Sequence, residues 1–456
     1  MGEPFYTYTA TRGIEEIKAG RLTATEWTRS CIDRIEATES TLKAWAFFNK
    51  DCALSQSAEL DKKLSLGADP SPLFGAPIGI KDIFNTYDMP TRRGSPVYEE
   101  YHPQNDARVV ARLRWAHGIV AGKTASDEFA VHWPTETVNP HNPDHTPGGS
   151  SSGSAASVAS GMVPLALSSQ TLGSTIRPAS YCGIYGFKPS FGLLPRTGMF
   201  KTTDTLDHVA FMSRSIEDTR LMLDTLRLSG PDHPFIHEKI DLRKTQNEKQ
   251  KPWKIARLIP PSWVHEEGYA NVALDQFADQ MQQAGVFLTD VRLPSAFEEA
   301  MVIHDTIYNV TLSYYFKEEY GKYQAQISPW FKEMVEKGMK ISTNEYRAAL
   351  ESQTRLTEEL EDCLNPFDAL ITLSAGGGEA PKGRFSRNKP DTCLIWTLCR
   401  VPALNVPLFQ GPQNLPFGCQ IIANRYDDYS LLDFVSFLKR RGLAGDAPIA
   451  RVKEDR

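Results

Sequence analysis

Several classes of protein are excluded by what this 456-residue chain lacks. It has only 7 cysteines and no C-x-x-C pair, which argues against a disulfide framework and favours reduced thiols. No apolar run approaches the roughly 20 residues of a membrane span, and the N-terminus lacks the pattern of a signal peptide. Lys and Arg number 50 against 56 for Asp and Glu, so no basic excess suggests nucleic acid. We therefore expect a cytoplasmic protein with neither a membrane nor a nucleic acid as its partner.

The rest of the composition, with 41% hydrophobic and 23% charged residues, is ordinary for a soluble globular protein. Residues 24–37 show helical spacing, with Thr23 or Thr25 as the cap. Residues 76–80 predict a short buried strand, 107–116 a helix and 119–123 another strand. This alternation is typical of an α/β protein. From about residue 230 to 365 the pattern changes to a polar run followed by aromatic-rich amphipathic helices.

Lys81 stands at the end of an apolar run, in the segment G-A-P-I-G-I-K-D. Such a lysine is expected to be partly buried, and burial lowers the pKa of an amine, so that its neutral form can act as a base. Lys123 and Lys188 also follow apolar runs or turns. Position alone therefore does not select Lys81 as the base.

Two clusters of glycine and serine follow, at residues 148–153 and at Gly173-Ser174. Without bulky side chains, the backbone in such turns can approach another group closely. Successive N–H groups can then converge on an anion, as in an oxyanion hole. Serines combined with a buried lysine can form a hydrolase that needs neither histidine nor metal.

Two rival motifs are weaker. The sequence around Ser151 matches G-x-S-x-G, but that nucleophile elbow requires a preceding strand, and residues 142–147 are rich in Pro, Asn and Asp. His141 and His145 are candidate metal ligands. They lie in a loop broken by prolines with no acidic partner motif, which favours a surface loop.

Taken in order, these segments resemble the amidase signature family over nearly the whole chain. The matching segments are residues 75–82, 122–124, 127–130, 135–136, 147–156, 173–189, 401–403 and 417–420. The resemblance implies a single α/β domain over residues 1–456, with a mixed, twisted central β-sheet covered by helices on both faces. Its parts would be N-terminal helices (1–66), a catalytic core (67–230), a variable helical specificity region (231–365) and the C-terminal part of the core (366–456).

The resemblance also implies a Ser–cis-Ser–Lys triad. Ser174 would be the nucleophile, Ser150 the bridging serine after a cis peptide, and Lys81 the base. The backbone N–H groups that would hold the oxyanion belong to Thr171, Leu172, Gly173 and Ser174. No metal and no cofactor is expected.

The chain departs from the family pattern close to the nucleophile. Gln170 stands where an aspartate is common, Leu172 replaces a glycine, and Arg177 directly precedes Pro178. Aligning Arg177 instead would make Thr175 the nucleophile. We prefer Ser174, because the match through Pro178 has no gap and the spacing from Ser150 fits the family.

The predicted substrate contacts are Ser151, His132, Trp133 and Trp396. We expect an amidohydrolase that cleaves the C–N bond of a small amide, carbamate or urea-like compound through an acyl-enzyme. Water is its second substrate. The sequence leaves open whether the protein forms a homodimer. Two alternatives remain: a glutamine amidase subunit of a tRNA-dependent amidotransferase, and a non-catalytic binding protein. A glutaminase would need a cation for the substrate carboxylate, with Arg384, Arg387 and Arg400 as candidates.

Overall fold

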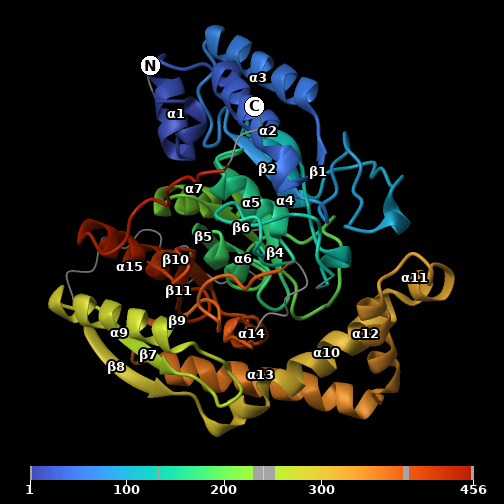
Figure 1. Ribbon diagram of the computed structural model, residues 1–456, viewed down its shortest axis with the longest axis vertical. Coiled ribbons are helices and arrows are strands. Elements are labelled where there is room, and N and C mark those ends of the chain that lie inside the picture. The colour runs from blue at the N-terminus through green and yellow to red at the C-terminus, as the bar shows by residue number, and fades with distance from the viewer. Residues whose placement is uncertain (1–2, 132, 230–239, 241–251, 384–389, 453–456) are drawn as a thin grey trace.

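Eleven strands of the described chain join in one sheet, in the order β1-β3-β2-β4-β6-β5-β10-β11-β9-β7-β8. The computed structural model describes residues 3–131, 133–229, 240, 252–383 and 390–452 (Figure 1). The strands are β1 (Trp45–Phe48), β2 (Pro77–Lys81), β3 (Ile119–Thr124), β4 (Leu165–Gln170), β5 (Tyr185–Lys188), β6 (His208–Ser213), β7 (Lys254–Ile259), β8 (Phe287–Arg292), β9 (Ala369–Leu373), β10 (Ala403–Gln410) and β11 (Pro416–Ile422).

The sheet combines parallel pairs with antiparallel pairs. β2 runs parallel to β3 and β4 on its two sides, while β6 is antiparallel to both β4 and β5. Residues that are distant in sequence therefore lie close together where neighbouring strands begin and end. Gln170 at the end of β4 pairs with His208 at the start of β6, and Lys81 pairs with Thr124. The predicted mixed central sheet is confirmed.

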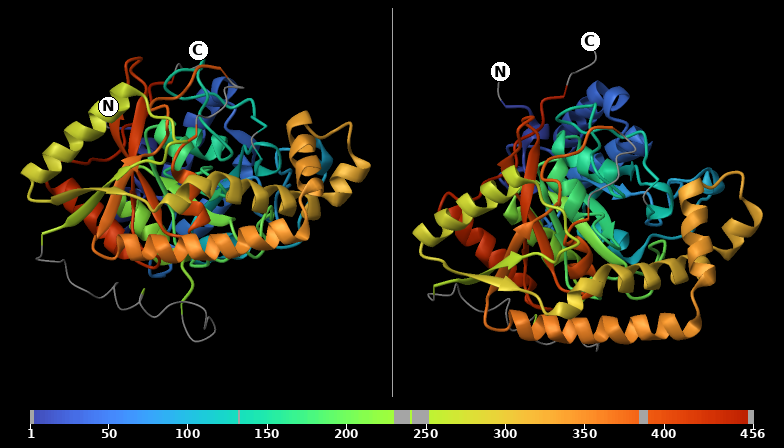
Figure 2. Two further views of the ribbon diagram at one scale, coloured as in Figure 1. Left: turned by 90° about the horizontal axis from the view of Figure 1, so that it is seen from below. Right: turned by 60° about the horizontal axis from the view of Figure 1, so that its bottom comes forward.

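Helices cover the sheet on both faces (Figure 1 and Figure 2). They are α1 (Ala10–Lys18), α2 (Ala24–Leu42), α3 (Lys50–Ser65), α4 (Arg108–Trp115), α5 (Ser152–Ala159), α6 (Ile176–Tyr181), α7 (Ile216–Leu226), α9 (Gly268–Gln283), α10 (Ala300–Tyr315), α11 (Lys317–Lys322), α12 (Pro329–Lys340), α13 (Thr343–Leu364), α14 (Cys393–Leu398) and α15 (Asp428–Arg440).

Alternating residues of β4 show how the two layers form. Ala166 packs with the small side chains of α5 and α6, whereas Leu165 and Leu167 pack with α4, α7 and α15 on the opposite face. Successive side chains of a strand point to opposite faces, so the first half of β4, which is covered on both faces, is apolar at every position. The small residues of α5 let this helix approach the sheet closely behind the serine clusters.

The N-terminal helices follow the sequence signals closely. Of the two threonines expected as caps of α2, Thr23 is the one used: its side chain accepts a hydrogen bond from the N–H of Glu26, whose carboxylate accepts one in return from the N–H of Thr23. This reciprocal capping box satisfies N–H groups that a helix start otherwise leaves open.

The middle of the chain is not purely helical. β7 and β8, which the sequence analysis did not predict, extend the sheet beyond β9 before the chain enters α10, α12 and α13. These helices project from the body with α11 at their far end (Figure 1 and Figure 2). The polar run at residues 244–251 lies outside the described residues.

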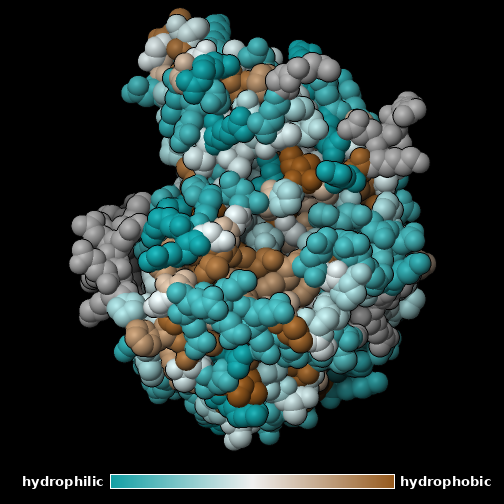
Figure 3. Space-filling view, turned by 60° about the vertical axis from the view of Figure 1, so that its left-hand side comes forward, coloured by the Kyte–Doolittle hydropathy of each residue, from teal (hydrophilic) through white to brown (hydrophobic). Residues whose placement is uncertain are grey.

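Hydrophilic side chains dominate the face seen in Figure 3, and apolar ones gather in a band across its middle and in smaller groups elsewhere. The exposed large apolar side chains are scattered over different elements, such as Trp115 on α4, Phe287 on β8 and Tyr314 on α10. Within the described ranges, no helix has the length and apolar character needed to cross a bilayer.

Candidate active site

Lys81 is fully buried at the end of β2. Its Nζ donates hydrogen bonds to Ser150 Oγ at 2.8 Å and to Ser169 Oγ at 2.9 Å. Burial lowers the pKa of Lys81 to about 7, although the negative charges of Asp127 and Asp207 oppose the shift. A large fraction of this amine is therefore neutral near pH 7 and able to accept a proton from a hydroxyl.

Ser150 reaches Lys81 because the glycines before it let the backbone come close. The Gly149–Ser150 peptide bond is cis. A Cβ on Gly149 would lie 2.1 Å from a carboxylate oxygen of Asp127, so only glycine fits there. The carbonyl of Ser150 accepts a hydrogen bond from the N–H of Asp127 at 3.1 Å. These contacts hold Ser150 between β2 and the loop that follows β3.

Ser174 lies in the loop between β4 and α6 and is almost completely buried. Its carbonyl accepts a hydrogen bond from the N–H of Ser151 at 3.3 Å, so the two serine clusters contact each other directly. The N–H groups of Thr171, Leu172, Gly173 and Ser174 have no hydrogen-bond acceptor among the residues that the structure describes. An almost buried loop with open donors is suited to bind an anionic oxygen.

The residues that depart from the family pattern form specific contacts with the nucleophile loop and its surroundings. Gln170 accepts hydrogen bonds through Oε1 from the N–H groups of Thr175 and Ile176, both at 3.0 Å, which a carboxylate could also do. Arg177 forms a buried ion pair with Asp391 at 2.7 Å. Its guanidinium packs so tightly against Gly173 that a Cβ there would lie 2.6 Å from Nη2.

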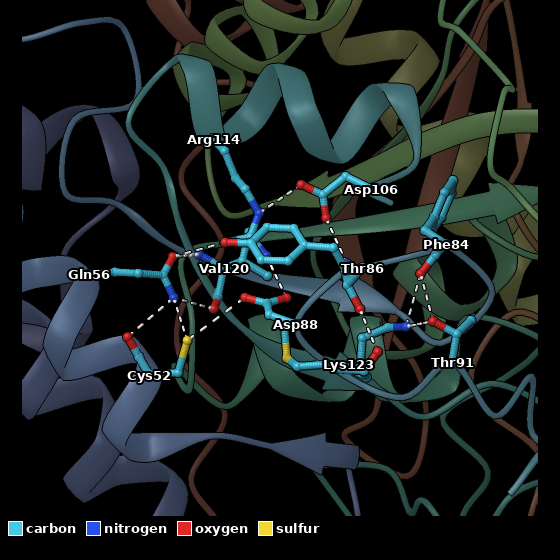
Figure 4. A network of polar contacts seen from close by, with 12 residues as sticks. Cys52, Gln56, Phe84, Thr86, Asp88, Thr91, Asp106, Arg114, Val120 and Lys123 are labelled. Atoms are coloured by element: carbon cyan, nitrogen blue, oxygen red, sulfur yellow. Dashed lines mark hydrogen bonds and ion pairs between the residues drawn. The ribbon is translucent and has the colours of Figure 1, made fainter. Parts of the chain in front are cut away.

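The two other lysines with similar sequence contexts are also fully buried, but their partners differ. Lys123 Nζ contacts Asp82 Oδ1 at 3.2 Å. It also donates to the hydroxyl of Thr91 at 2.6 Å and to the carbonyl of Phe84 at 2.9 Å (Figure 4). Lys188 donates to the carbonyl of Val401, and burial lowers its pKa to about 7. Neither of these two lysines hydrogen bonds a serine among the described residues.

The hydroxyls of Thr175 and Ser151, the two alternative nucleophiles, form hydrogen bonds with groups other than Lys81. Thr175 is fully buried, and its hydroxyl contacts the carbonyl of Ser169 and the hydroxyl of Ser168, both at 3.0 Å. Ser151 is the N-cap residue of α5 and donates weakly to the carbonyl of Ser169 at 3.3 Å. In the described chain, no strand leads directly into Ser151, as a nucleophile elbow requires.

The predicted substrate contacts lie in different surroundings. Ser151 is buried beside Ser174, and His132 lies outside the described residues. Trp133, 36% exposed, lines a cavity of about 460 Å³ together with Ser126 and other residues near the end of β3. Trp396 is fully buried on α14, inside the apolar cluster that α14 forms with α10, so its indole packs in the core.

Other polar candidates from the sequence contact protein groups. His141 and His145 each contact a backbone carbonyl, of Cys182 at 3.0 Å and of Ala380 at 2.7 Å. Arg400 donates to the side chain of Gln353 at 3.2 Å. Arg384 and Arg387 are outside the described residues.

Several residues of the site were missed by reasoning from the sequence. The hydroxyl of Ser169, like that of Ser150, accepts a hydrogen bond from the Lys81 amine. Asp207 accepts a hydrogen bond from the hydroxyl of Thr171 at 2.7 Å. Ser169 stands shortly before the nucleophile loop, so the alternation of β4 could have drawn attention to it. Asp207 carries no such signal, because it comes from the turn before β6.

A family model described as amidase matches residues 26–432 of the chain. Curated relatives include a glutamyl-tRNA(Gln) amidotransferase subunit from Natranaerobius thermophilus, which is 31% identical over 91% of this chain and 91% of its own length. The protein of the same name from Carboxydothermus hydrogenoformans is 30% identical over 94% of this chain and 96% of its own.

Solved structures with the same fold cover nearly the whole chain. One is described as a vestigial protein complex that reveals the origins of an s-triazine catabolic enzyme; it has a TM-score of 0.86 at 25% identity, over 96% of this chain and 99% of its own. The peptide amidase of Stenotrophomonas maltophilia has a TM-score of 0.80 at 23% identity, over 98% of this chain and 100% of its own. The second likeness is one of fold alone.

Proposed function

The chain belongs to the amidase family, and we propose that it hydrolyses a carboxamide through an acyl-enzyme formed on Ser174. The observation that carries the proposal is the contact of the Lys81 amine, whose pKa is about 7, with the hydroxyl of Ser150. Such an amine can take a proton at neutral pH, and the backbone hydrogen bond from Ser151 to Ser174 brings the segment that carries Ser150 next to the nucleophile loop.

In the proposed mechanism, Lys81 accepts the proton of Ser150 as Ser150 takes the proton of Ser174. The Oγ of Ser174 then forms a bond to the amide carbon, and the carbonyl oxygen becomes an oxyanion. When the C–N bond breaks, the proton returns through Ser150 to the leaving nitrogen. Water attacks the acyl-enzyme along the same proton path and releases the acid.

The N–H groups of the loop from Thr171 to Ser174 are the proposed oxyanion hole. They are available among the described residues, and their almost buried setting makes each donor more effective than in water. We propose that Trp133, on the wall of the cavity near the end of β3, contacts the substrate. Ser151, which is buried beside Ser174, is a further proposed contact, and Trp396 supports the apolar cluster that α14 forms with α10.

A second candidate is a glutaminase that works within an amidotransferase, as the names of the curated relatives indicate for those proteins. This candidate is favoured by the relatives, whereas the solved amidase and peptide amidase structures share only the fold with this chain. Both candidates use the same chemistry at Ser174 and differ in the acyl group and in the need for a partner.

The test is ammonia release by the purified chain from glutamine and from a panel of short aliphatic and aromatic carboxamides. Ser174→Ala is the inactive variant, and Ser168→Ala, in the adjacent strand, is its matched control. Turnover of a simple carboxamide that Ser174→Ala abolishes supports the first candidate. Turnover of glutamine alone, or only after a partner protein is added, supports the second. Equal turnover by Ser174→Ala and the wild type would refute both.

A further inference from the structure

The carbonyl oxygens of the nucleophile loop are held by side chains from two distant helices. His304, on α10, contacts the carbonyl of Thr171 through Nε2 at 2.9 Å. Thr397, on α14, donates its hydroxyl to the carbonyl of Leu172 at 2.8 Å. Both residues are fully buried. A carbonyl can only accept, so Nε2 of His304 carries the hydrogen.

These contacts determine where the N–H groups of the loop point. The peptide groups of residues 171–173 are trans, so each C=O is directed opposite to the N–H of the next residue. Because the carbonyl of Thr171 faces His304, the N–H of Leu172 is directed away from α10. Because the carbonyl of Leu172 faces Thr397, the N–H of Gly173 is directed away from α14.

Gln170 completes the arrangement. Its Oε1 accepts from two backbone N–H groups, which fixes the orientation of the amide and turns Nε2 toward Thr397 Oγ1 at 3.1 Å. Thr397 thus accepts from Gln170 and can donate its one hydrogen to Leu172. A carboxylate at position 170 would instead attract that hydrogen and release the carbonyl of Leu172.

From this geometry we infer that Gln170, Thr397 and His304 are positioning residues that aim the N–H groups of Leu172 and Gly173 at the oxyanion. The inference rests on the proposed function, since it assigns a role to the same loop. It explains the role of Gln170, which departs from the family pattern. It also means that α10 and α14, although they carry neither the serines nor the lysine of the site, influence the rate of the reaction.

The experiment measures covalent labelling of Ser174 by a fluorophosphonate, whose phosphoryl oxygen takes the position of the oxyanion. The rate constant of the chemical step and the binding constant of the probe are determined for Thr397→Val, Thr397→Ser and Gln170→Glu. Thr311→Val is the matched control, because Thr311 is a buried threonine of α10 whose hydroxyl bonds carbonyls of its own helix.

We expect Thr397→Val and Gln170→Glu to slow the chemical step by about 10- to 100-fold, somewhat less than the loss of a whole oxyanion donor. Probe binding and the pH dependence set by Lys81 should stay as in the wild type. Thr397→Ser should restore the rate to within about threefold, because it keeps the hydroxyl that the inference requires.

Two negative results have separate meanings. If Thr397→Val labels as fast as Thr311→Val while Ser174 is labelled in the wild type, the positioning inference is wrong and the proposed function stands. If the wild type carries no adduct on Ser174, the proposed function fails and the inference fails with it.

Discussion

Lys81 and Lys123 lie on adjacent parallel strands, almost side by side, and both are fully buried. The amine of Lys123 faces the carboxylate of Asp82, two backbone carbonyls and a hydroxyl, and these groups stabilise its charged form. The amine of Lys81 faces two serine hydroxyls and, among the described residues, has no carboxylate within ion-pair distance.

The difference teaches that burial alone does not make a lysine a base. Burial lowers the pKa of both amines, but at Lys123 the carboxylate of Asp82, in direct contact, opposes that shift and pairs with the amine. At Lys81 the charges of Asp127 and Asp207 act only through space, and the amine can exchange its proton with Ser150. The two lysines should therefore respond differently to substitution and to pH.

The largest effect is expected for Lys81→Met, which keeps the volume of the side chain and removes the amine. Labelling of Ser174 and amide turnover should fall by at least about 10³-fold, because the proton acceptor is lost. Thermal unfolding should occur at an unchanged or higher temperature, since an apolar chain replaces a buried amine. Retention of more than about a tenth of the activity would contradict the role assigned to Lys81.

The converse substitution, Lys123→Met, should affect stability. It leaves the buried carboxylate of Asp82 without its cation, and we expect the free energy of unfolding to fall by about 3–5 kcal/mol. Urea unfolding measures this loss, and the double variant Asp82→Asn/Lys123→Met should recover part of it. The folded fraction should still label Ser174, so a variant that is stable but inactive would overturn the comparison.

The two lysines should also differ in the pH dependence of labelling. Lys81 works as a base only when it is neutral, so the labelling rate should rise with pH through about 7 and level off above. Below that value the rate should fall by about tenfold per pH unit, because each unit reduces the neutral fraction about tenfold. Lys123→Met should keep this profile, and a midpoint near the ordinary lysine value of about 10 would rule out the lowered pKa.

The smallest effect is expected for Ser169→Ala, which removes one of the two hydroxyls that accept from Lys81. The rate should fall by about threefold to tenfold, the equivalent of one ordinary hydrogen bond. The midpoint of the pH profile should move to lower pH, because the charged amine loses an acceptor. Ser168→Ala, whose hydroxyl contacts Thr175 instead, is the control that should leave the midpoint in place.

The local parts of the site could be predicted from the sequence. The apolar run of β2 predicts where Lys81 lies, and the glycine pattern around Ser150 and Ser174 predicts backbone that can approach other groups closely. The structure places Lys81 Nζ within hydrogen-bond distance of Ser150 Oγ. Signals of this kind work because strand, turn and cap chemistry depend on neighbours in the sequence.

The parts that could not be predicted depend on contacts between distant segments. β8 lies at the edge of the sheet with mostly exposed residues, so no apolar run marks it as a strand. His304 and Thr397 reach the nucleophile loop from positions 133 and 225 residues away from their partners. Distinguishing Lys81 from Lys123 likewise required knowing that Asp82 turns toward Lys123.

The most direct test of the central claim maps the fluorophosphonate adduct by mass spectrometry in the wild type, Ser174→Ala, Lys81→Met and Lys123→Met. The account predicts one adduct, on Ser174, in the wild type and in folded Lys123→Met, and none on that residue in the other two variants. An adduct on Thr175 or Ser151, or full labelling of Lys81→Met, would contradict it.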